Sequence, residues 1–396
     1  MAKSPNDVVV TGIGLASSLG VGRAAHEAML FSGTLPQPVI ETEKFAPYPV
    51  HPLVAVDWSE QIPKRGDQRQ MENWQRLGVF AAGLALDDAG FKDDAEACGT
   101  MDMIVAAGGG ERDINVDSLI VDEALKRNDR EELLNEKLTT ELRPTLFLAQ
   151  LSNLLAGNIS IVHKVTGSSR TFMGEEGAGV SAVETAAARI RAGQSTHALV
   201  GGAFIAERLD IILMVEAIKG HQTGKWEPIW ARDRSAGGGM IMGTVGAFLI
   251  LESRAHAEAR GAKIYAVIDR VEGDRGNRAE GRMEKRLTRM LDGSDISLVL
   301  SGTSGFHELA KREKSYLEER FPNAAIRGYG GMLGHSVEAQ FTAGIALAAM
   351  ALAAHKPVAP FDADHEKPMT KGADQALVTT IGHQRGEGIA LLAANS

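Results

Sequence analysis

The sequence has a single cysteine, few aromatic residues and no excess of basic residues. Of its 396 residues only Cys98 carries a thiol, so no disulfide can form within the chain, and this favours a reducing compartment. The formal net charge is -9, which disfavours nucleic acid as a partner because phosphate binding requires a basic surface. Residues 1–14 lack the charged and then apolar pattern of a signal peptide. We therefore expect a cytoplasmic protein that does not bind nucleic acid.

Long hydrophobic runs are also missing. The longest apolar run, at 346–355 (ALAAMALAAH), is rich in alanine. It is shorter than the roughly 20 residues that a bilayer-spanning helix needs. We therefore expect no membrane insertion.

Strand-like and helical segments alternate along the whole chain, which is typical of an α/β fold. Buried strands are indicated at 101–110 and 197–204, and a helix at 144–161. The alanine-rich helices at 178–192 and 342–354 fall at comparable places in the two halves, which hints at a duplicated unit. Because no proline-rich linker separates the halves, we expect one compact body.

Two local features need separate interpretations. The stretch 111–143 is charged and helical in composition, and we expect it to leave the core as a cap or a partner-facing insertion. Near the N-terminus, Gly12 and Gly14 follow an apolar strand, as in a dinucleotide site. The third glycine of that fingerprint is replaced by Ser17, so we do not expect a nucleotide there.

Motifs spread over nearly the whole chain resemble those of the β-ketoacyl-acyl-carrier-protein synthases, which have the thiolase fold. They include VVVTGIGLASSLG at 8–20, THALVGGAF at 196–204, LSGTSG at 300–305, MLGH at 332–335 and TTIGHQRGEG at 379–388. The resemblance implies an α/β protein with two related α-β-α-β-α half-domains in a layered arrangement. The halves are expected at 1–252, with the insertion at 111–143, and at 253–396. It also implies a homodimer or a heterodimer.

The family transfers acyl groups by covalent catalysis at a cysteine that precedes a buried helix. Acyl or malonyl groups arrive on the phosphopantetheine of acyl carrier protein, so the resemblance implies no bound metal and no other cofactor. Two histidines assist the decarboxylation of malonyl-carrier protein, and backbone N–H groups form an oxyanion hole.

This sequence departs from the family pattern at the catalytic positions. Counting back from Gly193 puts the nucleophile position at Glu176, in the turn before a helix. Ser301 stands at the position of the first histidine, whereas His335 retains the second. Gly330 stands where a lysine is usual. The resemblance thus gives Glu176, His335 and Ser301 as the candidate catalytic residues.

The loop that normally reads Gly-Phe-Gly-Gly-Thr-Asn near the C-terminus reads GHQRGE here, at 382–387. His383 therefore occupies the place of the gating phenylalanine, whose backbone N–H normally completes the oxyanion hole. With Ile381 and Thr303, it is a candidate substrate-binding residue.

A glutamate at the nucleophile position needs its own explanation. A carboxylate is a poor acyl acceptor, because the mixed anhydride that it forms falls back or hydrolyses. The N–H groups of a helix N-terminus favour an anion there, whereas burial opposes ionisation. We hypothesise that one oxygen of Glu176 occupies the former oxyanion hole and holds the site closed. Cys98 is not the nucleophile, because it precedes the strand at 101–110, far from this turn.

The neighbouring residues have simpler alternatives. Glu175 is interpreted as a solvated or helix-capping carboxylate. His335 is either a hydrogen-bonded core residue or a general acid or base that acts with Glu176. Ser301 either bonds its own backbone or joins His335 and Glu176 in a hydrolytic triad. His383 plugs the acyl tunnel, bonds Glu176 or faces solvent.

These features favour a non-condensing partner subunit that resembles the chain-length factors. Such a subunit would pair with a cysteine-bearing synthase paralogue in fatty acid or polyketide synthesis. One alternative is a malonyl-carrier-protein decarboxylase or thioesterase-like enzyme that uses Glu176 and His335. Two others are a weakly active 3-oxoacyl-carrier-protein synthase and a scaffold that binds acyl chains or carrier protein.

Overall fold

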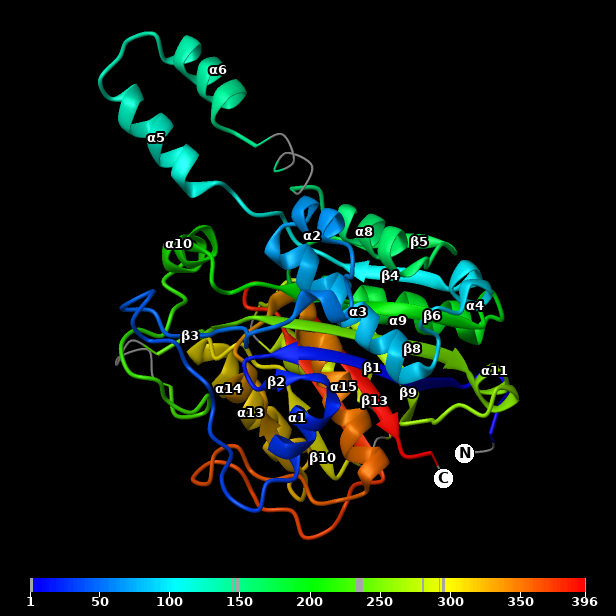
Figure 1. The fold of residues 1–396 in the computed structure, drawn as a ribbon. Coiled ribbons are helices and arrows are strands. Elements are labelled where there is room, and N and C mark those ends of the chain that lie inside the picture. Colours follow the sequence, from blue (N-terminus) through cyan, green and yellow to red (C-terminus); the bar gives the residue numbers. More distant parts are fainter. Residues whose placement is uncertain are drawn as a thin grey trace.

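The computed structural model describes residues 3–143, 146, 150–232, 238–279, 281–291, 293 and 296–395. Its main feature is a large mixed sheet whose central strand is β1 (Val8–Ser17). On one side β1 pairs with β8 (Val245–Ser253), and on the other with β9 (Ala266–Asp274), in both cases antiparallel (Figure 1). The centre of the sheet is thus a strand from the start of the chain held between two strands from its middle.

The two halves of the sheet repeat one topology. One half runs β1–β8–β6–β4–β5 outward, and the other runs β9–β13–β12–β10–β11. In both halves the two inner pairings are antiparallel and the two outer pairings are parallel. Their remaining strands are β4 (Asp102–Ala106), β5 (Ser169–Phe172), β6 (His197–Phe204), β10 (Leu298–Ser301), β11 (Ala325–Gly328), β12 (Gln375–Ile381) and β13 (Glu387–Ala393). This repeated order supports the duplicated unit that the alanine-rich helices suggested.

Two helices form a middle layer between the halves of the sheet. Helix α9 (Glu175–Arg191) contacts β4 and β6 of one half and β9 of the other, and α15 (Gln340–Ala354) contacts β8 and β12. Their many alanines and glycines permit this close packing on both sides. Helices α3 (Asn73–Ala89) and α8 (Leu154–His163) cover one outer face, and α12 (Arg282–Met290) and α13 (His307–Arg320) pack in a separate core against the other. The expected α-β-α-β-α layering is confirmed, with the middle layer shared by both halves.

Several short elements complete the fold. The helices are α1 (Gly22–Leu30), α2 (Arg65–Gln70), α4 (Ala95–Thr100), α10 (Leu209–Ala217), α11 (Arg254–Ala259), α14 (Gly330–Leu333) and the 3-10 turns η1 (Trp58–Glu60) and η3 (Val337–Ala339). The short strands are β2 (Gly20–Val21), β3 (Val50–His51) and β7 (Met242–Gly243). The helix expected at 144–161 is α8, which begins at Leu154; residues 144–145 and 147–149 lie outside the described residues.

The glycines of the N-terminal G-x-G serve packing. A Cβ at Gly14 would lie 1.9 Å from the carbonyl oxygen of Ala81, and one at Gly12 would lie 2.4 Å from that of Ala85. Both carbonyls belong to α3, so only glycine lets this helix approach β1 so closely. This contact explains the motif without a nucleotide.

Helix α15 differs from what the sequence indicated. Together with η3 it forms a helical stretch, Val337–Ala354, that is long and apolar enough to cross a membrane by length and composition. The run at 346–355 is thus the end of a longer helical stretch than the sequence indicated. In the structure 83% of that stretch is buried, because it lies in the middle layer.

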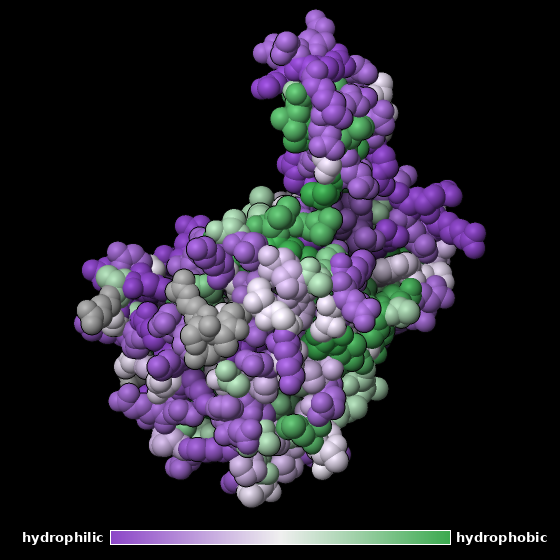
Figure 2. Space-filling model, turned by 90° about the vertical axis from the view of Figure 1, so that its left-hand side faces the viewer, coloured by the Kyte–Doolittle hydropathy of each residue, from purple (hydrophilic) through white to green (hydrophobic). Residues whose placement is uncertain are grey.

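A helical hairpin projects from the body (Figure 1). It consists of α5 (Ile114–Ala124) and α6 (Arg130–Thr140), which confirms the excursion expected at 111–143. Four of its apolar side chains are exposed: Val121, Leu125, Leu134 and Leu138. Apolar residues also gather on the body below the hairpin (Figure 2). Exposed apolar side chains of α10 and the residue after it are Leu209, Leu213, Met214 and Ile218.

Candidate functional site

Glu176 lies in the first turn of α9, directly after the turn that follows β5. Gly174 has a φ of 96° and Glu175 a φ of 41°, so the chain bends sharply before the helix begins. A positive φ at a residue other than glycine costs about 1–2 kcal/mol, so this turn is held by its surroundings. It points Glu176 inward, where the residue is fully buried.

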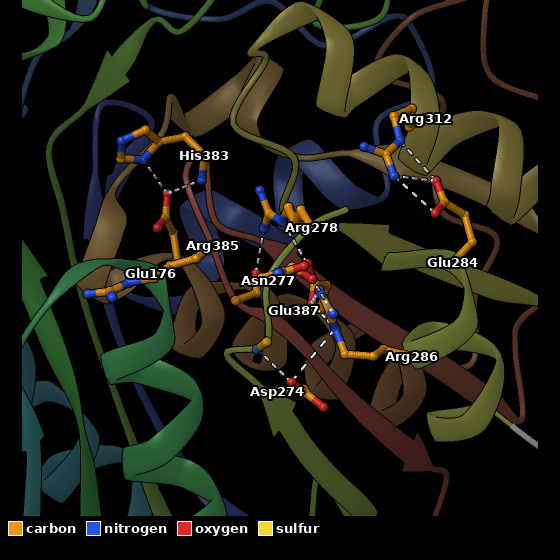
Figure 3. A network of polar contacts seen from close by, with 12 residues as sticks. Glu176, Asp274, Asn277, Arg278, Glu284, Arg286, Arg312, His383, Arg385 and Glu387 are labelled. Atoms are coloured by element: carbon orange, nitrogen blue, oxygen red, sulfur yellow. Dashed lines mark hydrogen bonds and ion pairs between the residues drawn. The ribbon is translucent and has the colours of Figure 1, made fainter. Parts of the chain in front are cut away.

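Two histidines from the second half of the chain meet the Glu176 carboxylate. His335 Nε2 donates to Oε1 at 2.8 Å. The backbone N–H of His383 and its ring Nδ1 each contact the same oxygen at 3.3 Å (Figure 3). His335 follows α14, and His383 lies in the turn between β12 and β13. The site is therefore assembled where the two halves meet.

Charge explains the protonation of this cluster. Burial alone would raise the pKa of Glu176, but the hydrogen bonds from His335 and His383 outweigh it and lower that pKa well below its usual range. Burial opposes protonation of His383, yet Glu176 raises the pKa of His383 above its ordinary value. The arrangement thus favours a carboxylate at Glu176 and a protonated His383.

The second carboxylate oxygen lies against the turn that carries His383. Within the described residues, Glu176 Oε2 is buried and has no hydrogen-bond partner. A Cβ at Gly382 would lie 2.8 Å from this oxygen, so glycine is what lets the turn close over the carboxylate.

The contact between Glu176 and His383 predicts a pH dependence of stability. Because the pKa of Glu176 is lowered by folding, its contribution is present above the ordinary value of 4.5 and is lost as the pH falls. Because the pKa of His383 is raised, its contribution is complete below the ordinary value of 6.5 and is lost as the pH rises through the folded value. The contact between Glu176 and His383 should therefore stabilise the folded protein most between pH 4.5 and pH 6.5.

The measurement is the melting temperature of the wild type and of the His383→Gln variant between pH 5 and 8. We expect the wild type to exceed the variant most near pH 5.5 and to lose that advantage by pH 8. A difference that stays constant over this range would contradict a protonated His383.

Ser301 lies apart from this cluster. Its Oγ donates to Glu313 Oε1 at 2.8 Å, and Thr379 Oγ1 donates to the same oxygen at 2.5 Å. The backbone N–H of Thr303 donates to Ser301 Oγ at 3.3 Å. Burial raises the pKa of Glu313. The structure therefore brings Glu176, His335 and His383 together, whereas the bonds of Ser301 do not form the hydrolytic triad.

Sequence reasoning missed Glu313, although a signal existed. Leu309, Glu313 and Leu317 are spaced by four on α13 and are all buried. A charged residue on the apolar face of a helix indicates a buried partner.

The other expected substrate residues are not in the lining of the cavity beside His335 and His383. Ile381 is buried in the hydrophobic core formed with α12, and Thr303 is also buried. At Gly330, where the family has lysine, a Cβ would lie 2.9 Å from the carbonyl oxygen of Thr303 and 3.0 Å from Ile229. A larger side chain at 330 would require these neighbours to move.

A cavity of about 570 Å³ opens beside the cluster. His335, His383, Glu175 and Glu338 border it, and Glu175 also lies 3.8 Å from Arg385. Its remaining wall is mostly apolar and includes Phe204, Ile211, Met214, Val215, Met240 and Met242. Glu338 was not anticipated from the sequence. The cavity suits an apolar chain with one polar end near the histidines.

The thiol of Cys98 is separate from this site. It is buried in α4 and donates to the carbonyl oxygen of Phe91 at 3.3 Å. Burial raises the pKa of Cys98 to about 11, so the thiolate needed of a nucleophile is disfavoured. Within the described residues, no group of three or more histidine, cysteine or carboxylate side chains is placed to hold a metal.

Comparison with known proteins agrees with the fold. Residues 5–257 match the N-terminal domain of beta-ketoacyl synthases, which is more than half of the chain. The chain belongs to the β-ketoacyl synthase family. This β-ketoacyl synthase family protein is 26% identical over 273 residues to 3-oxoacyl-[acyl-carrier-protein] synthase 2 of Vibrio cholerae, a match that covers 67% of the chain and 62% of that relative.

Two further comparisons cover nearly the whole chain. The tetracenomycin polyketide synthase ketoacyl synthase alpha subunit of Streptomyces glaucescens is 27% identical over 389 residues, covering 91% of this chain and 88% of the relative. Among solved structures, the ishigamide ketosynthase/chain length factor superposes with a TM-score of 0.78 at 19% identity, covering 98% of this chain and 99% of that one. At that identity the superposition shows the shared fold.

Proposed function

We propose that this protein is a non-condensing partner subunit that shapes the acyl product of a cysteine-bearing synthase. The observation that carries this proposal is the buried contact of Glu176 with His335 and with the backbone N–H of His383. By the family resemblance, this is where an acyl-cysteine would place its oxyanion. A carboxylate that already fills this place leaves no room for a thioester carbonyl.

The chemistry of the site agrees with a lost condensation step. The resemblance puts Glu176 where the family has its nucleophilic cysteine, and the chain's one thiol is buried elsewhere. A carboxylate that accepts three contacts on one oxygen is a weak nucleophile, because those donors stabilise its charge. The proposed role is therefore structural.

Unpaired surfaces support a partner chain. Strand β5 lies at one end of the sheet, pairs only with β4 among the described strands, and exposes Ser169 and Arg170. An open strand edge invites pairing with another chain. The exposed apolar residues of the α5–α6 hairpin and of α10 also suit an interface. A ketosynthase/chain length factor shares this fold, and we propose the same kind of pairing here.

The proposal places this protein in the cytoplasm, in a pathway of fatty acid or polyketide synthesis. Its partners would be a cysteine-bearing synthase paralogue and acyl carrier protein. A homodimer of this chain is the alternative assembly.

One observation favours a second candidate function. Decarboxylation of malonyl-carrier protein in this family uses two histidines, and His383 supplies a second histidine beside His335 at the border of the cavity. With Glu176 between them, the cluster is suited to decarboxylate malonyl-carrier protein or to hydrolyse a thioester.

The test is to purify the chain alone and together with a cysteine-bearing synthase from the same source. We expect the chain alone to leave malonyl-carrier protein unconsumed, to join the synthase in gel filtration, and to change its product length by mass spectrometry. If the chain alone releases acetyl-carrier protein or free acid, and Glu176→Ala abolishes this, the second candidate is correct.

Surface variants locate the interface. The double change Leu125→Asp and Leu138→Asp on the hairpin should weaken the complex at least tenfold without lowering the melting temperature of the free chain. Leu35→Asp is the matched control, because Leu35 is an exposed apolar residue that lies outside the hairpin and α10. Equal weakening by both would argue against the hairpin as the contact.

A further inference from the structure

Glu338 is a buried carboxyl that its own backbone N–H contacts but that no other described residue hydrogen-bonds. It lies in η3, just before α15, with 6% of its surface exposed. No hydrogen bond joins its side chain to another residue of the described chain. It borders the cavity together with His335 and Glu175.

The backbone makes room for this side chain. A Cβ at Gly108 would lie 2.3 Å from Glu338 Oε1 and 3.0 Å from its carboxyl carbon. Gly108 also borders the cavity, so the carboxyl occupies a space that only glycine leaves open. Any larger residue at 108 would displace Glu338 from this position.

The surroundings disfavour a charge on Glu338. Burial raises the pKa of Glu338 to about 7, and the negative charges of Glu176 and Glu175 act in the same direction. The hydrogen bond from its own backbone N–H and the positive charge of Arg208 lower the pKa, but burial outweighs them. Near neutral pH the group is therefore partly a neutral acid, which both donates and accepts hydrogen bonds.

Polar side chains such as Arg208 and Gln384 also line the cavity, but within the described chain none of them hydrogen-bonds the Glu338 carboxyl. Phe204, Met240 and Met242 line the same space with apolar atoms. A saturated hydrocarbon chain would fit these walls but would bury Glu338 without a hydrogen bond, which is costly. A chain with an oxygen near Glu338 would fit both the apolar wall and the carboxyl.

We propose that Glu338 makes this cavity selective for acyl chains that carry a ketone or hydroxyl oxygen, over saturated acyl chains. The inference rests on the proposed function, because it takes the ligand of the cavity to be an acyl group. It goes beyond that function by naming the class of acyl chain. The physical basis is that a site built around a hydrogen bond rejects a ligand that lacks the matching group.

The test measures binding to the full-length chain by calorimetry at pH 7. The probes are decanoyl-pantetheine, 3-oxodecanoyl-pantetheine and 10-hydroxydecanoyl-pantetheine. We expect at least one oxygenated probe to bind tenfold or more tightly than decanoyl-pantetheine. Decanoyl binding as tight as both oxygenated probes, or no binding of any probe, would overturn the inference.

Variants assign the preference to Glu338. Glu338→Gln keeps a donor and an acceptor and should keep the preference, whereas Glu338→Leu should lose it and bind decanoyl-pantetheine more tightly. Glu216→Leu makes the same change on exposed α10 surface outside the cavity lining and should bind as the wild type does. A preference that survives in Glu338→Leu, or that is lost in Glu338→Gln, would assign the selectivity elsewhere. If Glu338→Leu does not fold, the wild type and Glu338→Gln still decide the question.

Failure of this inference is distinguishable from failure of the proposed function. Probe binding is measured on the isolated chain, whereas the proposed function is tested by complex formation and product length with a synthase. Selective binding without a complex would leave the selectivity standing and remove the partner role. A complex without selective binding would support the partner role and overturn the selectivity.

Discussion

Replacing His335 by alanine is expected to lower the free energy of unfolding by about 3–5 kcal/mol, the usual cost of leaving a buried charge, here the Glu176 carboxylate, without its partner. The side chains of Glu176 and His335 are each 1% exposed, so water cannot replace the lost hydrogen bond. The remaining contacts to Glu176, both from His383, are longer at 3.3 Å. Urea denaturation of the wild type and of the variant at pH 6 measures the difference.

A double variant separates coupling from simple truncation. Glu176→Ala combined with His335→Ala removes both partners and should cost less than the sum of the two single changes. The matched control is His365→Ala. His365 also bonds a carboxylate, Asp362 Oδ2 at 2.8 Å, but its side chain is 36% exposed. That control should cost about 1 kcal/mol or less. If the two single changes add, or if His365→Ala loses as much free energy of unfolding, then Glu176 and His335 are not energetically coupled as a buried pair.

Replacing Glu387 by alanine is expected to lower the free energy of unfolding by a similar amount, about 3–5 kcal/mol, because it removes the buried carboxylate that two guanidinium groups share. The Glu387 side chain is fully buried, and those of Arg278 and Arg286 are each 11% exposed. Arg278 Nε donates to Oε1 at 2.7 Å, and Arg286 Nε donates to Oε2 at 2.5 Å (Figure 3). Thermal and urea unfolding measure the loss.

Glu387→Ala should also alter the candidate site, because Glu387 lies next to the turn that carries His383. Glu387 begins β13 and pairs with Ile381 of β12, so it closes the turn that carries His383. Loosening that turn weakens the contact with Glu176, and the pKa of His383 should fall toward its ordinary value in NMR titration. The matched control is Glu284→Ala. Its partner Arg312 is 35% exposed, so about 1 kcal/mol or less is expected. A His383 pKa that does not move in Glu387→Ala would show that the turn does not depend on this pair.

The local elements were largely predictable from the sequence. The alternation of apolar strands and helices indicated an α/β fold, and the charged stretch at 111–143 forms the projecting α5–α6 hairpin. The full length of the apolar helix could not be predicted from the apolar run alone. The apolar run at 346–355 was judged too short to cross a bilayer by its own length, whereas in the structure it ends a longer stretch, Val337–Ala354, that also contains Glu338 and Gln340. The division into halves at 1–252 and 253–396 stays a prediction.

The polar partners could not be predicted in the same way. Glu176 and His335 were each singled out by their place in a motif, and His383 by its place in the gate. Their mutual contact was only one of several alternatives. Glu338 and the partners of Glu387 gave no such signal, since each depends on what surrounds it in space, and Glu313 gave only its spacing on a helix.

The family resemblance implied the layered arrangement. By itself the sequence determined the order of strands and helices, the α/β class and the lack of a thiol at the turn before α9. Those properties follow from periodicity and composition, which act over a few residues at a time. Only the tertiary structure decided that His335 and His383, 159 and 207 residues away from Glu176, share one of its oxygens. The physical reason is that this meeting depends on how two halves of a sheet pack around α9 and α15, and no local pattern encodes that distance.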